Sequence, residues 1–183
     1  MIEDLLQDAE VKMDGAVAHV QDEFGTVRTG RANPGILHRV SVEYYGSPTP
    51  LQQLASFSVP EPRMLVVQPY DKSSITSIER AIQASELGLN PSNDGNVIRL
   101  AFPPLTEERR KELIRVVRHM AEEGRIAVRN VRRHTKDDLE ALEGDVSEDD
   151  VRRAEERLQE ITDRHVARID ELLQHKEEEL LEV

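Results

Sequence analysis

Residues 109–136 read RRKELIRVVRHMAEEGRIAVRNVRRHTK, and this stretch decides how the rest of the chain is interpreted. It holds 10 of the 24 lysines and arginines but only three acids, so its net charge is +7 within a chain of −12. At about 100° per residue along an α-helix, its basic and apolar side chains fall on opposite sides. The stretch therefore predicts one amphipathic helix.

We call the basic side of this expected helix the basic face. Its members fall within an arc of about 100° and are Lys111, Arg115, Arg118, Arg125, Arg129, Arg132, Arg133 and Lys136. Glu122 is the only acid inside this arc. The opposite, apolar side comprises Leu113, Val116, Val117, Met120, Ala127, Val128, Val131 and Thr135.

The basic face has two interpretations. Most charged helix faces are simply solvated, and that interpretation stays open. A polyanionic partner is favoured because like charges three or four residues apart repel one another, and because the stretch has eight arginines against two lysines. Arginine binds phosphate bidentately and stacks on bases. On a chain of net charge −12, such binding has to be local and oriented.

Two further helices are predicted on either side. In residues 2–29 and 148–181, apolar side chains recur three and four positions apart. Their seams are Leu6, Ala9, Met13, Ala16, Val20, Phe24 and Val27 in the first, and Val151, Ala154, Leu158, Ile161, His165, Ile169 and Leu172 in the last. Thr106 is the expected N-cap of the basic helix, which runs to about Leu142, and Ser147 caps the last helix. Three long helices predict a three-helix bundle.

The segment 31–104 has a different composition. It contains all nine prolines, five of the six phenylalanines and tyrosines, and no net charge. Strands are expected at 40–44, 57–59, 64–68 and 97–100, a helix at 74–87, turns at 46–50 and 93–95, and a break at 60–62. The prediction is an α+β chain: a bundle of 1–30 plus 105–183 with an inserted β/α/β domain, 31–104.

Hinges are expected near 30–31 and 102–105, where the chain crosses between the two domains. The expected hinge residues are Gly30, Arg31, Phe102, Pro103 and Pro104. Glycine can absorb a φ change, and the prolines keep the second crossing from extending the helix that follows.

Composition argues against several classes of function. There is no cysteine, hence no disulfide or thiolate metal site. The acidic N-terminus does not resemble a signal peptide and no apolar run could span a membrane, so a cytoplasmic protein is expected. Residues 25–32 superficially match a phosphate-binding loop, but Arg31 replaces the lysine and Ala32 cannot bind Mg²⁺. The histidines lack metal-ligand spacing, and His165 is expected as a hydrogen-bonded core residue. We predict no catalysis, metal or cofactor.

Five segments together resemble the bacterial ribosome recycling factor family. They are 28–34 (RTGRANP), 42–46 (VEYYG), 87–91 (LGLNP), 103–111 (PPLTEERRK) and 128–133 (VRNVRR). The resemblance covers essentially the whole chain in order, although the segment around 142–148 is shorter than is common in the family.

The resemblance implies an L-shaped protein that binds the large ribosomal subunit and its RNA after termination. It implies joint action with the GTPase elongation factor G to split the ribosome, with no hydrolysis by the factor itself, and we expect a monomer. The implied RNA-binding residues are Arg28, Arg31, Arg110, Lys111, Arg129, Arg132 and Arg133, to which the basic face adds Arg118 and Arg125. The alternative is a coiled-coil scaffolding protein whose basic face binds an acidic protein.

Overall fold

The chain folds into two compact units, residues 1–28 together with 106 onwards, and residues 29–105. The structure is a computed structural model that describes residues 1–182. None of the helices in that range is long and apolar enough to cross a membrane. The first unit is entirely helical and the second combines a helix with β-strands, so the predicted α+β class is confirmed.

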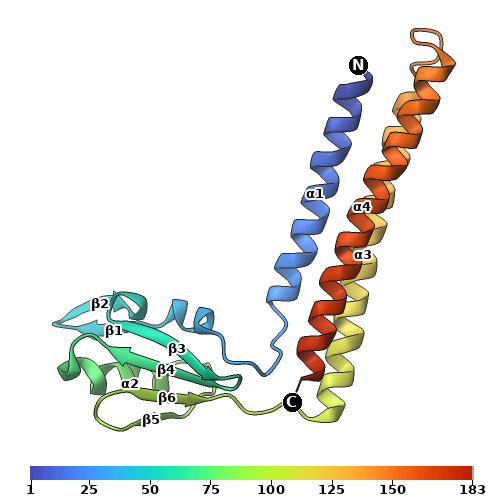
Figure 1. The fold of residues 1–183 in the computed structure, drawn as a ribbon. Helices are drawn as coiled ribbons and strands as arrows, with labels where there is room; N and C mark the ends of the chain where they lie inside the picture. The colour runs from blue at the N-terminus through green and yellow to red at the C-terminus, as the bar shows by residue number, and fades with distance from the viewer. Residues whose placement is uncertain (183) are drawn as a thin grey trace. The chain divides into compact units, whose positions relative to one another are not determined.

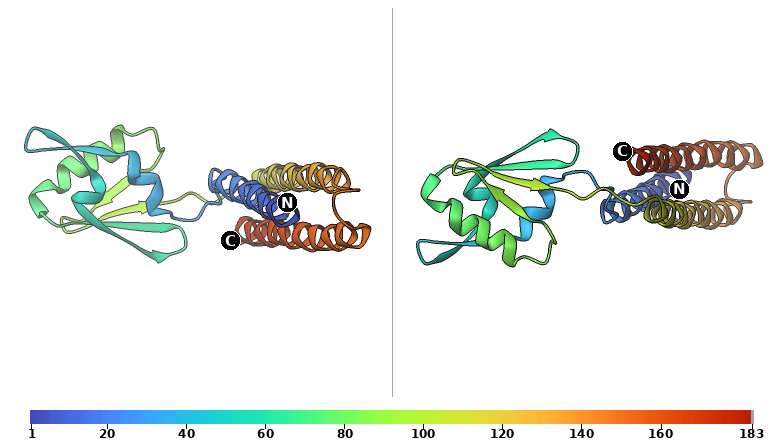
Figure 2. Two further views of the ribbon diagram at one scale, coloured as in Figure 1. Left: turned by 90° about the horizontal axis from the view of Figure 1, so that it is seen from above. Right: turned by 90° about the horizontal axis from the view of Figure 1, so that it is seen from below.

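The helical unit is a bundle of α1 (Ile2–Gly25), α3 (Glu107–Glu140) and α4 (Glu148–Leu181) (Figure 1). The three helices lie alongside one another in every view (Figure 2). α1 and α4 run in the same direction and α3 runs in the opposite one. The predicted N-caps are confirmed, since the side chains of Thr106 and Ser147 each accept a backbone hydrogen bond of 3.2 Å from the third residue that follows.

Two helix ends were predicted wrongly. α1 ends at Gly25 and not at residue 29, because the chain turns at Thr26, whose hydroxyl donates to the Glu23 carbonyl at 2.6 Å. α3 ends at Glu140 and not at Leu142. The predicted seam of α1 was also wrong at one position, because Val17 is buried where Ala16 was expected.

The buried side of α3 differs from the predicted apolar side. It is formed by Leu113, Val117, Ala121, Gly124, Val128, Thr135 and Leu139. Val116 is 42% exposed and Ala127 is also exposed. The helix is rotated because small residues lie at the contact: an ideal Cβ on Gly124 would overlap Val20 Cγ2 and lie 3.3 Å from Ile169 Cδ1. The neighbouring helices therefore approach α3 at Gly124, closer to the basic face than predicted.

The second unit is built on a four-stranded antiparallel sheet of order β3-β4-β6-β5. Its strands are β3 (Ala55–Glu61), β4 (Met64–Pro69), β5 (Pro91–Asn93) and β6 (Ile98–Ala101). The unit also contains a hairpin of β1 (Ser41–Tyr44) and β2 (Ser47–Pro50) and the helix α2 (Ile75–Ala84). Short 3₁₀ helices occupy Pro34–Arg39, Leu51–Gln53 and Lys72–Ser74. α2 packs on the sheet (Figure 2), and Ile78 and Ile82 join strand residues such as Leu65 and Ile98 in one core.

Proline-rich segments of this unit were predicted less well than the rest. The expected turn at 46–50 is a two-residue turn, Tyr45-Gly46, followed by strand β2. β3 continues through Pro60, with a pairing irregularity between Ser58 and Glu61. Both segments lie at sheet edges, where a proline without an N–H group is tolerated. α2 ends at Ala84, three residues earlier than expected, and the short strand β5 was missed.

The turn between β5 and β6 depends on the carboxylate of Asp94. Its Oδ1 accepts backbone hydrogen bonds from Val97 and Asn96, both 2.9 Å, and its Oδ2 accepts one of 2.7 Å from Arg99. These bonds, of which that from Val97 contributes most, lower the pKa of Asp94 from its ordinary value to about 2. The ionised side chain therefore stabilises the folded unit above the pKa of the unfolded chain, and this stability is lost as pH falls towards 2.

We predict that Asp94→Asn lowers the unfolding free energy of this unit at neutral pH, and that the difference from wild type disappears near pH 2. Tyrosine fluorescence in a urea titration measures it, because all three tyrosines lie in this unit and the chain has no tryptophan. If the two proteins differed equally in unfolding free energy at neutral pH and near pH 2, the ionised Asp94 side chain would not have the stabilising role given to it.

Candidate nucleic-acid interface

Three arginines of α4 pair with acids of α1. Arg157 pairs with Glu3, Arg164 with Glu10 at 3.0 Å, and Arg168 with Asp14 at 2.7 Å. Each pair is 154 positions apart in the chain, as expected for two parallel helices in a fixed register. The hydrogen bonds from Arg168 and His165 lower the pKa of Asp14.

His165 is a core residue, as predicted. Its side chain is 3% exposed. Nδ1 lies 2.6 Å from the Ile161 carbonyl and Nε2 lies 3.0 Å from Asp14 Oδ1. Both ring nitrogens therefore face acceptors, and His165 links α4 to α1 in place of binding a ligand.

A second set of pairs joins α3 to α4. Arg118 Nε lies 2.5 Å from Glu177, and Arg125 Nη2 lies 2.6 Å from Asp170. The two arginines are seven residues apart, and so are their acidic partners. The later arginine pairs with the earlier acid, so the two ion pairs fix the register of the antiparallel helices. We call Arg118 and Arg125 the paired arginines.

The pairing changes the electrostatics of the predicted basic face. The hydrogen bond to Glu177 raises the pKa of Arg118. Desolvation opposes the charged form of Arg125, whose side chain is 18% exposed. Hydrogen bonds to Asp170 and Glu122 nevertheless raise its pKa. The expectation that only Glu122 relieves the repulsion within the basic face is therefore wrong, because α4 supplies two further carboxylates.

Arg132 occupies the third position of this seven-residue series and has a different partner. Its Nε donates a 2.7 Å hydrogen bond to the amide oxygen of Gln159, whose own NH₂ group donates to Asp163 at 2.8 Å. A neutral amide therefore stands where Arg118 and Arg125 meet a carboxylate. The positive charge of Arg132 is held in position by this bond but is not neutralised by it.

The remaining arginines of the basic face are exposed and, in the part of the chain that the structure describes, form no pair with α4. Arg129 makes only a 3.4 Å ion pair with Glu122 and is 55% exposed. Within residues 1–182, no hydrogen bond or ion pair engages Arg115 or Arg133. We call Arg115, Arg129 and Arg133 the outward arginines. Their charges, with that of Arg132, are available to an external anion.

The other predicted RNA-binding residues are spread over more of the chain. Arg110 and Lys111 lie in the first turn and a half of α3, where Lys111 pairs with Glu107 at 2.8 Å on an exposed surface. Arg28 follows α1 and is exposed, whereas Arg31 belongs to the second unit. The structure thus groups Arg129, Arg132 and Arg133 on little more than one turn of α3 and does not place Arg28 or Arg31 on that helix.

The predicted hinge residues lie beside two backbone anchors of the second unit. The amide of Ala32 donates to the Pro62 carbonyl and that of Phe102 donates to the Arg63 carbonyl, both at 2.8 Å. Phe102 also packs against the core of this unit. Gly30 has φ +78°, a conformation that favours glycine. The segments free of these anchors are therefore 29–31 and 103–105.

Sequence reasoning missed the acidic side chains of α4 that pair with α3. No partner was assigned to Asp170 or Glu177 from the sequence. A signal was present, because Arg118, Arg125 and Arg132 recur every seven residues and so do Asp163, Asp170 and Glu177. To use this recurrence as a signal, one must know which residue of α4 lies opposite which residue of α3.

Comparison with known proteins gives one family throughout. The family model described as "Ribosome recycling factor" matches residues 20–181. The "Ribosome-recycling factor" of Acidothermus cellulolyticus is 57% identical over 185 aligned positions and covers 100% of both chains. That of Rubrobacter xylanophilus is 58% identical over 180 positions and covers 97% of both.

Solved structures agree with the sequence comparisons. A solution structure of a ribosome recycling factor matches with a TM-score of 0.75 and 46% identity, covering 100% of this chain and 98% of the other. A Thermus thermophilus ribosome recycling factor, placed with Escherichia coli elongation factor G on the E. coli post-termination complex, matches with a TM-score of 0.64 and 46% identity over the whole of both chains.

Proposed function

The chain belongs to the ribosome recycling factor family, and from that membership we propose that α3 binds the RNA of the large ribosomal subunit. The protein acts on the post-termination ribosome and, with elongation factor G and GTP, promotes its dissociation into subunits. It is a non-enzymatic factor, and elongation factor G supplies the GTPase. It works as a monomer in the cytoplasm, where ribosomes are.

The observation that carries the RNA contact is the cluster of Arg129, Arg132 and Arg133. None of these three guanidinium groups meets a carboxylate of α4 within the described residues. Phosphate contacts from arginine are charge-assisted and bidentate, so they need guanidinium groups that are not already neutralised. We place the main phosphate contacts at this cluster, with Arg110, Lys111 and Arg115 extending the surface towards the start of α3.

The paired arginines have a different role in this proposal. Arg118 and Arg125 hold α3 and α4 in register through Glu177 and Asp170. A phosphate would have to compete with those carboxylates, so their contribution to RNA binding is secondary. Arg28 and Arg31 lie near the connection between the units and add local positive charge there. The scaffolding alternative finds no support in the comparisons.

We predict that Arg132→Glu weakens binding to purified large subunits by about 1–3 kcal/mol, roughly a 5- to 150-fold loss, because it removes a charge-assisted contact and adds repulsion. The melting temperature changes little, since the exposed bond to Gln159 contributes about 1 kcal/mol or less. Affinity is measured by equilibrium sedimentation with a fluorescently labelled protein.

Arg153→Glu is the matched control, because it changes the net charge equally on an exposed site of α4 whose only ion pair is a 3.9 Å contact with Asp150. It is expected to leave subunit affinity nearly unchanged. An equal loss in both variants would show that overall charge governs binding and would remove the role given to Arg132.

A further inference from the structure

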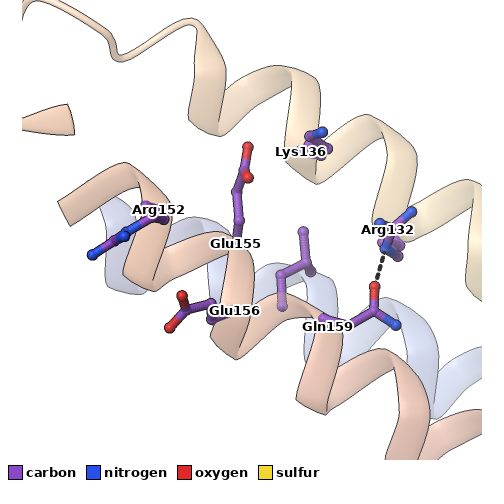
Figure 3. Close-up of a pocket in the computed structure, with 7 residues that line it drawn as sticks. Arg132, Lys136, Arg152, Glu155, Glu156 and Gln159 are labelled. Carbon is purple, nitrogen blue, oxygen red and sulfur yellow. Dashed lines mark hydrogen bonds between the residues drawn. The ribbon is translucent and has the colours of Figure 1, made fainter. Parts of the chain in front are cut away.

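A groove opens between α3 and α4 next to the Arg132–Gln159 hydrogen bond (Figure 3). It encloses a cavity of about 230 Å³. Sites for drug-sized ligands measure roughly 300–1,000 Å³, so this groove suits a smaller, planar group. Its lining combines three cations, two carboxylates, an amide and one apolar side chain: Arg132, Lys136, Arg152, Glu155, Glu156, Gln159 and Leu158.

Two carboxylates line the groove, and Glu155 is the one that is partly buried. It is half-buried and extends from α4 towards α3, near Lys136 (Figure 3). Within residues 1–182, no hydrogen bond or ion pair engages its carboxylate. Its neighbour Glu156 is exposed and points away from α3 in the same view. Glu155 is therefore a preplaced acceptor for a ligand that offers two adjacent donors.

The rim of the groove favours an anion on the same ligand. Arg132 is uncompensated, and the ion pairs of Lys136 with Glu140 at 3.3 Å and of Arg152 with Asp149 at 3.5 Å are local, exposed contacts of little strength. Leu158 is 2% exposed and gives the groove an apolar floor. A planar ring with donors on one edge and an attached phosphate matches this arrangement.

We propose that this groove holds a guanine base extruded from the RNA that α3 binds, with Glu155 accepting from its Watson–Crick edge and the cationic rim contacting its phosphate. The proposal rests on the proposed function and adds the identity of the base. Proteins commonly read splayed RNA bases on that edge. The guanidinium of Arg132, fixed by Gln159, also provides a plane on which a base stacks.

Guanine is the base that fits because its N1–H and N2–H₂ groups are adjacent donors that a carboxylate accepts together. Adenine and cytosine each present one donor beside an acceptor, and the acceptor repels a carboxylate. Uracil presents a single donor between two acceptors. Replacing the carboxylate by an amide, Glu155→Gln, supplies one acceptor and one donor, which complements adenine or cytosine instead of guanine.

The experiment is an NMR titration of ¹⁵N-labelled protein with GMP, AMP, CMP and UMP. GMP is expected to shift the resonances of Leu158 and Gln159 and to bind at least about fivefold more tightly than the other three nucleotides. About fivefold is the lower end of the discrimination that one bidentate base contact provides. Glu155→Gln is expected to bind AMP better than GMP. Glu160→Gln removes the same charge at an exposed position of α4 outside the groove lining and keeps the GMP preference. A GMP preference unchanged by Glu155→Gln, or no shift with GMP, overturns the proposal.

Competition with purified large subunits distinguishes an RNA base from a free nucleotide. GMP, but not AMP, is expected to weaken subunit binding. Glu155→Gln is expected to weaken it about fivefold, whereas Glu160→Gln is not. GMP that fills the groove without affecting subunit affinity overturns the RNA assignment. A wild-type protein that does not bind large subunits at all refutes the proposed function instead, and the nucleotide titration does not depend on that result.

Discussion

A disulfide between the two connecting segments is expected to abolish ribosome splitting while leaving ribosome binding intact. Gly30 and Leu105 are the positions to join, because an ideal Cβ on Gly30 would lie 3.4 Å from Leu105 Cγ. In Leu105→Cys the sulfur takes the place of this Cγ, so it lies within reach of a side chain at position 30. The chain contains no other cysteine, so the pair Gly30→Cys and Leu105→Cys can form only the intended bond within one molecule.

The expected loss follows from where the second unit is anchored. Ala32 and Phe102 are tied by backbone hydrogen bonds to Pro62 and Arg63, so we expect movement between the units to be absorbed at Gly30 and in 103–105. Hinges are short loop segments that take up φ and ψ changes. We propose that elongation factor G drives such a movement while α3 stays on the RNA, so freezing the segments stops splitting.

Splitting is measured by light scattering with elongation factor G and GTP, before and after reduction of the disulfide. Reduction should restore activity, which separates the crosslink from any effect of the two substitutions. Gly30→Cys with Leu105→Ser cannot form the bond and should be insensitive to oxidation. Full splitting by the verified oxidised form would rule out the hinge mechanism.

Gly124→Ala is expected to destabilise the helical unit, although alanine is the better helix former. The added methyl group would overlap Val20, which is fully buried, and would lie 3.3 Å from Ile169 Cδ1. Overpacking a core costs about 1–3 kcal/mol, whereas the gain in helix propensity is about 1 kcal/mol. The net loss is up to about 2 kcal/mol and is measured by thermal denaturation followed by far-UV circular dichroism.

Gly15→Ala is the matched control in α1, because no atom lies within 4 Å of its ideal Cβ. It is expected to stabilise the unit by up to about 1 kcal/mol. In a Val20→Ala background, the new methyl group at Gly124 has room, so the second substitution should cost much less there. An equal cost of Gly124→Ala in both backgrounds would contradict the proposed contact.

Features fixed by local sequence could be predicted for this chain. The caps at Thr106 and Ser147 depend on side-chain bonds to a residue three positions later, and the long periodic seams identify the helices. β2 was missed because Pro48 and Pro50 indicate a turn. The hairpin pairs Pro48 with Glu43 all the same, which a strand with a free edge permits.

Features that depend on packing between distant segments could not be predicted. The buried side of α3 follows from Ala121 and Gly124, whose lack of bulk carries no hydrophobic signal of its own. The division of the basic face into paired and outward arginines follows from the register of α3 against α4. That register is a tertiary property, so the sequence predicted a uniform face where the structure has two kinds of arginine.

The most direct test of the outward arginines as the RNA anchor is the salt dependence of binding to large subunits. Log affinity falls linearly with log salt concentration, and each lost phosphate contact reduces the slope by about 1. Arg129→Gln with Arg133→Gln is expected to reduce the slope by about 2. Arg118→Gln with Arg125→Gln removes the same net charge and is expected to leave the slope unchanged. Equal slopes for the two double variants would contradict the account.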